Sequence, residues 1–92
     1  MIRSFADKYT ERLFARQRVP KFQGIEQIAW RKLQHLEAAA SLDDLAAIPG
    51  NQLEKLVGDR KGQYSVRING QYRICFTWAD DDPHDVEIVD YH

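Results

Sequence analysis

Apolar residues recur at helical spacing in the first half of the chain and at alternating spacing in the second half. The longest helical pattern predicts an amphipathic helix from Ile25 to Ala40. Its apolar stripe contains Ile25, Ile28, Leu33, Leu36 and Ala40. The polar residues Arg31, Lys32 and Gln34 fall mostly outside this stripe, so we expect them to face solvent.

Shorter elements precede and follow this helix. Residues 2–5 read as a short strand, and Asp7 is suited to cap a helix with Tyr9, Leu13 and Phe14 as its apolar positions. Residues 15–24 form a basic loop punctuated by a proline and a glycine. Ser41 can cap a short helical turn that reaches residue 47 and ends before a Pro-Gly pair.

The second half of the chain has the alternation of β-strands. Two leucines flank a short strand at residues 54–55, and a charged turn at 58–62 follows. Apolar side chains then alternate with polar ones over residues 64–68 and 72–78. An aspartate-rich turn at 80–83 leads to a last strand that contains Val86, Ile88 and Val89.

The hairpin between residues 64 and 78 has a register that can be argued from its faces. A two-residue Asn69-Gly70 loop would put the apolar residues of the two strands on opposite faces, which a core on one side cannot accept. A three-residue loop of residues 68–70 pairs Val66 with Tyr72 and keeps one face apolar. The same register pairs residue 64 with residue 74 and gathers Ser65, Arg67, Arg73, Cys75 and Thr77 on the other face.

The pattern therefore predicts a single α+β domain over residues 1–92, with two main N-terminal helices packed on one face of a small, mainly antiparallel sheet. The other face is expected to be open and polar. Arg73 should lie on this open face, so that its truncation would cost little stability, within about 0.5 kcal/mol.

Charge and cysteine content narrow the class of protein. All 13 lysines and arginines lie within residues 1–73, whereas residues 74–92 hold six acidic residues and no basic one. A protein whose basic residues are concentrated in one part of the chain can bind a polyanion on one side of the molecule. The single cysteine, the absence of a signal-peptide pattern and the absence of an apolar run of about 20 residues predict a cytoplasmic protein.

The polar face holds residue types that suit RNA cleavage. Without a metal, this reaction needs a base for the 2′-hydroxyl, a cation for the phosphate and an acid for the leaving 5′-oxygen. Arg73 can hold a phosphate through its planar fork, and it can equally be an ordinary strand arginine. The candidates on or near this face are Glu54, Arg60, Lys61, Arg67, Arg73, Asp90, Tyr91 and His92.

The C-terminal run Asp90-Tyr91-His92 is a second candidate feature. His92 titrates near neutral pH and suits proton transfer, although a terminal residue is often idle. Tyr91 can stack on a base or pack on the core. The scattered histidines form no zinc motif, and the chain lacks a P-loop and a GxGxxG motif, so no metal or cofactor is predicted.

The whole chain resembles the HigB-type toxins, a branch of the RelE/ParE superfamily of toxin–antitoxin systems. The residues that carry the resemblance are Met1–Phe5, Pro49–Glu54, Gly58–Arg67, Tyr72–Trp78 and Val86–His92. The resemblance implies a RelE-like fold and ribosome-dependent cleavage of messenger RNA, without a cofactor. It also implies a helix-turn-helix antitoxin that neutralises the toxin, and binding of both proteins to their own operator DNA.

Residue roles follow from the same resemblance. It implies that Arg73 holds the phosphate, that Asp90, Tyr91 and His92 form the C-terminal part of the active site, and that Arg60 and Lys61 contact RNA. Some family members have a histidine at the position of Glu54 and a lysine at that of Val57. Because this chain has neither residue, either Glu54 or His92 serves as the general base or cleavage is slow, and Glu54 can equally pair with a nearby lysine.

Two other functions remain open at the level of sequence. One is a ParE-like toxin that inhibits DNA gyrase by binding, a class that lacks the C-terminal run of Asp90, Tyr91 and His92. The other is a binding module that acts only as a corepressor with its antitoxin.

Overall fold

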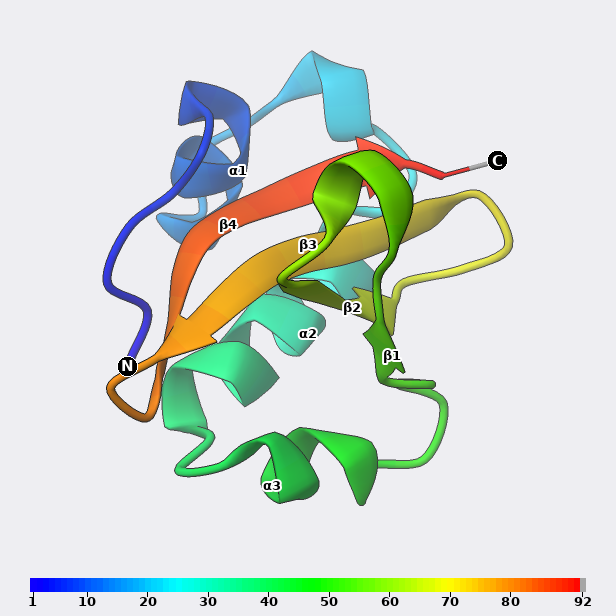
Figure 1. The fold of residues 1–92 in the computed structure, drawn as a ribbon. Coiled ribbons are helices and arrows are strands. Elements are labelled where there is room, and N and C mark those ends of the chain that lie inside the picture. Colours follow the sequence, from blue (N-terminus) through cyan, green and yellow to red (C-terminus); the bar gives the residue numbers. More distant parts are fainter. Residues whose placement is uncertain (92) are drawn as a thin grey trace.

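In the part of the chain that the structure describes, four antiparallel strands form one sheet in the order β1-β2-β3-β4 (Figure 1). The computed structural model describes residues 1–91 of the chain. The strands are β1 (Glu54–Lys55), β2 (Gln63–Arg67), β3 (Tyr72–Ala79) and β4 (Asp82–Asp90). The α+β class and the antiparallel sheet agree with the sequence, and β1 occupies the two residues between the flanking leucines.

Within residues 1–91, three α-helices and two short 3₁₀-helices accompany the sheet. The α-helices are α1 (Lys8–Phe14), α2 (Glu26–Ala38) and α3 (Leu42–Ala46), and the 3₁₀-helices are η1 (Pro20–Phe22) and η2 (Gly58–Arg60). Both predicted caps are present, because Asp7 accepts a hydrogen bond from the Thr10 N–H at 2.7 Å and Ser41 accepts one from the Asp44 N–H at 3.2 Å. No helix within residues 1–91 is long and apolar enough to cross a bilayer.

One cluster of buried apolar side chains joins the helices to the sheet. It includes Leu33 and Leu36 of α2 together with Val66, Ile74 and Phe76 of the strands. The predicted stripe is wrong at two positions, because Ala40 lies beyond the end of α2 and is exposed, whereas Lys32 is buried. A charged side chain is normally exposed, but Lys32 can be buried because its ammonium donates a hydrogen bond to Asn51 Oδ1 at 2.5 Å.

The outer edge of β4 is covered by the N-terminal segment. Phe5 forms a single parallel bridge with Val86, so the strand predicted at residues 2–5 is reduced to one bridge. The N–H of Ile88 finds its acceptor in the Thr10 hydroxyl of α1 at 3.0 Å. The N-terminal segment and α1 thus satisfy backbone groups that an exposed edge strand would offer to another chain.

The β2–β3 hairpin keeps the predicted faces but not the predicted pairs. Val66 pairs with Ile74 instead of Tyr72, and Tyr64 pairs with Phe76 instead of Ile74. The loop is residues 69–71, because the Asn69 side chain accepts the N–H groups of residues 71 and 72, each at 2.8 Å. This local turn takes the place of a left-handed Gly70. The shift is two residues in register, so every side chain stays on its expected face.

A candidate site under a covering segment

The face of the sheet turned away from α2 carries two rows of mostly polar side chains. We call it the arginine face. The first row crosses all four strands through Glu54, Ser65, Cys75 and Glu87, which are successive cross-strand partners. The second row contains Arg67, Arg73 and Val89. Directly paired residues point to the same side of a sheet, so residues distant in sequence meet here.

The arginine face is not open, contrary to the prediction from the alternation. Two parts of residues 51–62, which we call the covering segment, lie against it on either side of β1: the Gln52 carbonyl accepts from Arg73, and η2 lies in front of the strands in Figure 1. Arg60 fixes this segment by donating from Nη1 to Gln63 Oε1 at 3.0 Å and to Glu87 Oε1 at 3.3 Å. The alternation identified a polar face, but it contained no signal that a loop folds back onto it.

Arg73 is consequently buried, with 7% of its surface exposed. Its Nε donates to Ser65 Oγ at 2.7 Å, and its Nη2 donates to the Gln52 carbonyl at 2.6 Å and to the Ser65 carbonyl at 3.4 Å. The prediction that Arg73 faces solvent was therefore wrong, and the small stability cost of its truncation that rested on this exposure is no longer expected. Among the described residues Nη1 has no hydrogen-bond acceptor, so this nitrogen is left for a ligand.

The carbonyl that receives Arg73 belongs to a strained residue. Gln52 has φ 45°, in the left-handed region that residues other than glycine seldom adopt. The neighbouring Asn51 is anchored on both sides: its side chain binds Lys32 and the Leu45 carbonyl, and its own carbonyl accepts the Arg67 N–H at 2.6 Å. The anchored Asn51 holds Gln52 in a conformation that aims its carbonyl at the guanidinium.

The C-terminal run divides between the two faces of β4. Asp90 is the partner of Tyr72, so its side chain lies on the side opposite Arg73, where Oδ2 accepts from Gln71 Nε2 at 3.1 Å. Tyr91 lies on the arginine face: its ring centroid is 5.9 Å from the Arg73 guanidinium carbon, and its side chain is 40% exposed. His92, the predicted proton-transfer group, lies outside the described residues.

The other predicted site residues lie around Arg73 at different depths. Glu54 is exposed and shares a row with Ser65, the residue that holds the Arg73 Nε. Arg67 is half-buried beside Arg73, and Lys61 is exposed at the end of η2. Arg60 is already paired with Glu87, so it reaches a ligand only by sharing or leaving that carboxylate.

Cys75 lies at the centre of the arginine face and is fully buried. Burial raises the pKa of its thiol, while the nearby Arg60 and Arg73 lower the pKa and Glu87 raises it. A thiol kept protonated by its surroundings is a poor nucleophile and a poor metal ligand. Among residues 1–91, no group of three His, Cys, Asp or Glu side chains is arranged to hold a metal ion.

Two residues that position Arg73 were not singled out from the sequence. The alternation placed Ser65 on the correct face. Its hydroxyl is a hydrogen-bond acceptor close to Arg73, and this could have indicated that the arginine is bonded within the protein. Gln52 offered no such signal, because its contribution is a backbone carbonyl and a left-handed φ.

Comparison with solved structures identifies the fold. Two structures of the YoeB–YefM toxin–antitoxin complex from Staphylococcus aureus, one described as heterotetrameric, each match with a TM-score of 0.63 and 21% sequence identity. Both matches cover 100% of this chain and 98% of the matched chain. The chain therefore has the fold of the matched chain in these complexes.

Sequence comparison then gives the family. Residues 3–92 match the family described as the RelE-like toxin of the type II toxin–antitoxin system HigB. Toxin HigB-1 of Vibrio cholerae serotype O1 is 39% identical over 82 residues, covering 87% of this chain and 86% of that protein. An uncharacterised protein of Haemophilus influenzae is 29% identical over 91 residues, covering 87% of this chain and 88% of that protein. The chain belongs to the HigB-like family of type II toxins.

Proposed function

We propose that this toxin is an endoribonuclease that cleaves messenger RNA on the translating ribosome in the cytoplasm. The observation that carries the proposal is Arg73, a guanidinium held in place on the arginine face of a chain of this toxin family. Cleavage by attack of the 2′-hydroxyl places growing negative charge on the phosphate, and a preoriented cation stabilises that charge.

Arg73 supplies this stabilisation through its remaining nitrogen. Ser65 and Gln52 occupy Nε and Nη2, which leaves Nη1 to donate to a phosphate oxygen. Because the side chain is already ordered, little conformational entropy is lost when the phosphate binds. Tyr91 borders the guanidinium, so its exposed ring stacks on a base next to the scissile phosphate.

Proton transfer is assigned to Glu54 and His92. Glu54 reaches the site from β1 and has the exposure that a carboxylate base requires. Histidine is the side chain best suited to proton transfer near neutral pH, so His92 is proposed to protonate the leaving 5′-oxygen. Asp90 points to the opposite side of β4 and affects the active site indirectly. Its hydrogen bond with Gln71 helps to hold the C-terminal end of β4 in place.

Basic side chains around Arg73 extend the contact to the flanking RNA backbone. Lys61 is exposed on the covering segment and binds a phosphate as a point charge. Arg60 and Arg67 bind further phosphates at the borders of the face, with Arg60 shared between RNA and Glu87.

The partner of the toxin is proposed to be an antitoxin with a helix-turn-helix domain, with which it represses its own operator. The support is the family assignment and the YoeB–YefM complexes of the same fold. If the product of the reading frame next to this gene fails to co-purify with the toxin, or leaves its toxicity unchanged, the partnership is refuted.

The main experiment is induction of the toxin in growing cells followed by pulse-labelling of protein and DNA. Protein synthesis is expected to stop first, and purified toxin is expected to cut messenger RNA in a translation mixture. If DNA synthesis stops first while translation continues, the gyrase-binding function replaces the nuclease. If neither stops, the chain acts only as a corepressor.

A further inference from the structure

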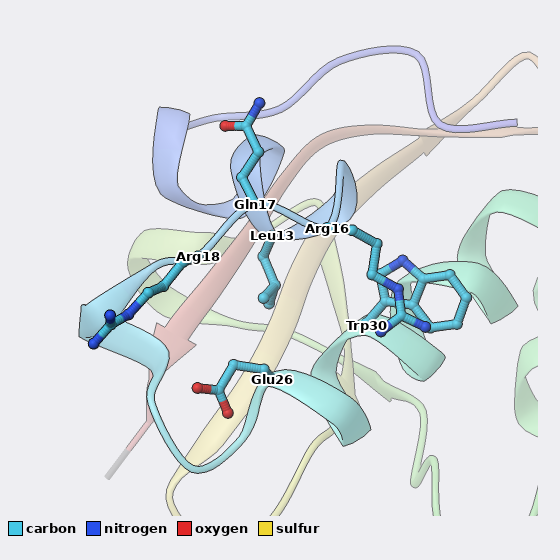
Figure 2. Close-up of a pocket in the computed structure, with 6 residues that line it drawn as sticks. All are labelled: Leu13, Arg16, Gln17, Arg18, Glu26 and Trp30. Atoms are coloured by element: carbon cyan, nitrogen blue, oxygen red, sulfur yellow. The ribbon is translucent and has the colours of Figure 1, made fainter.

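Lys32 is the one buried charged residue of α2, a helix that the structure describes in full. The other charged side chains of this helix are exposed or half-buried. Figure 2 shows one of them, Glu26, at the border of an open hollow of about 260 Å³ that Arg16, laid over Trp30, lines as well. By contrast, only 7% of the Lys32 surface is exposed. An ammonium removed from water is costly unless it is paired, and methionine would fill the same space without that cost.

The pairing of Lys32 is limited to a neutral acceptor. Its ammonium donates to Asn51 Oδ1 at 2.5 Å, and none of the salt bridges within residues 1–91 includes it. Burial, followed by the charges of Arg31 and Arg67, lowers the pKa of the Lys32 side chain. Because its surroundings disfavour this charge, we expect its structural benefit in the residue that it holds, which is Asn51.

Asn51 is fully buried and is held through every polar group that it has. Its side-chain amide accepts from Lys32 and donates to the Leu45 carbonyl at 3.1 Å. Its backbone N–H donates to the Ile48 carbonyl at 3.2 Å, and its backbone carbonyl accepts the Arg67 N–H at 2.6 Å. Without Lys32 the buried amide oxygen would lose its ammonium donor, so Lys32 completes the anchoring of Asn51.

The turn around Asn51 contains two left-handed residues, Gly50 with φ 85° and Gln52 with φ 45°. Glycine adopts this conformation freely, whereas glutamine adopts it only where the surrounding structure enforces it. The side chain of Gln52 is exposed, so the anchored Asn51 is the nearest constraint on this backbone. The Gln52 carbonyl accepts from Arg73 Nη2 at 2.6 Å, so the conformation of Gln52 influences where the guanidinium lies.

We propose that Lys32 is a positioning residue for Arg73 and acts through Asn51. The inference rests on the proposed function, in which Arg73 stabilises charge on the scissile phosphate. Ser65 holds the guanidinium from β2, whereas Lys32 and Asn51 fix it through the carbonyl of Gln52. Two constraints from different elements restrict the direction of Arg73 Nη1, the nitrogen that the proposed function assigns to the phosphate.

The test combines an isosteric variant with a second change that should make Lys32 dispensable. Lys32→Met keeps the length of the side chain and removes its hydrogen-bond donor. Gln52→Gly keeps the carbonyl that binds Arg73 and adopts a left-handed φ without strain. If Lys32 acts by holding Gln52 in that conformation, the loss caused by Lys32→Met should be smaller in the Gln52→Gly protein. Arg31→Met removes the same charge at an exposed position of α2 and is the control.

Two quantities are measured on the full chain, together with the Tm of each variant. The first is the rate at which the Arg73 Nη2 group rotates about its bond to Cζ, measured by NMR in protein labelled with nitrogen-15 arginine. The hydrogen bond to the Gln52 carbonyl slows this rotation, and the measurement needs no RNA. The second is kcat and KM for cleavage of a message on translating ribosomes.

Lys32→Met is expected to speed the rotation several-fold and to lower kcat several-fold with little change in KM. Its Tm should change little, because removal of a buried charge offsets part of the lost hydrogen bond. Most of both losses should disappear when Gln52→Gly is added, and Arg31→Met should behave as the natural protein. If Lys32→Met fails to fold, the same cycle is run with Asn51→Ser, for which the proposal predicts the same dependence on Gln52→Gly.

Unchanged rotation in folded Lys32→Met would overturn the proposal. Losses of equal size with and without Gln52→Gly would also overturn it, because they would show that Lys32 serves only the packing of α2. A natural protein that cleaves no message, but whose Arg73 rotation responds to Lys32→Met as expected, would refute the proposed nuclease and leave the positioning of Arg73 by Lys32 intact.

Discussion

Replacement of Arg73 by alanine is expected to damage both stability and cleavage, and the structure gives the size of each effect. The side chain is 7% exposed and makes short hydrogen bonds of 2.7 Å to Ser65 Oγ and 2.6 Å to the Gln52 carbonyl. A hydrogen bond to a charged group contributes about 1.5–3 kcal/mol. Gln52 is exposed, so water can replace part of its lost bond, whereas Ser65 is fully buried and cannot recover its partner.

The expected loss of stability is therefore about 3 kcal/mol. For a domain of this size, 1 kcal/mol corresponds to about 4–8 °C in Tm, so the variant should melt roughly 12–24 °C below the natural protein. Loss of a preoriented donor to transition-state charge lowers kcat by about 10²–10³-fold. Cleavage must be compared at a temperature at which the variant is still folded.

The assay pairs thermal melting with cleavage of a message on translating ribosomes. Arg31→Ala, at an exposed position of α2, is the matched control and should change neither quantity. An Arg73→Ala protein that melts within a degree or two of the natural protein would refute the reasoning from burial. A folded variant that cleaves at the natural rate would refute the phosphate role, whatever its melting temperature.

Three further predictions concern neighbouring groups. Ser65→Ala should lower kcat several-fold with little change in KM, because the Arg73 Nε loses its acceptor while Nη2 keeps the Gln52 carbonyl; a change confined to KM would contradict the positioning role. A chain that lacks His92 should lose about 10²–10⁴-fold in cleavage rate with an unchanged Tm, and equal rates would move proton transfer to Glu54. Hydrogen bonds from the amino terminus and from Arg3 lower the pKa of Asp82 below 3.8, so its contribution to stability is present above that pH and is lost as the pH falls through the folded-state pKa. The Tm of the natural protein should therefore exceed that of Asp82→Asn at neutral pH, and a gap that persists after the carboxyl is protonated would disprove this origin.

The elements of the fold were largely predictable because they depend on local chemistry. The caps at Asp7 and Ser41, the alternation of β2 and β3 and the punctuation by glycine and proline are each encoded within a few residues. The predicted residue pairs of the β2–β3 hairpin were wrong because the Asn69 side chain stabilises a loop of residues 69–71 in place of the expected loop of residues 68–70.

The environment of the site was less predictable because it depends on contacts distant in sequence. Lys32 looks like a surface residue until Asn51, nineteen positions later, gives it an acceptor. Arg73 looks exposed until the covering segment brings the Gln52 carbonyl over it, twenty-one positions earlier in the chain. Alternation gives the face of a side chain, but only tertiary structure decides whether that face meets water.

Cys75 makes the opening of the site measurable in the unmodified protein. It is the one cysteine in the sequence, and its sulfur lies beneath the covering segment. A thiol reagent can reach it only while the part of that segment around Arg60, which is bonded to Glu87 beside Cys75, is lifted. The labelling rate, divided by the rate for a free thiol, gives the fraction of time that the segment is open. A bound RNA that bridges the segment and the sheet should slow this labelling.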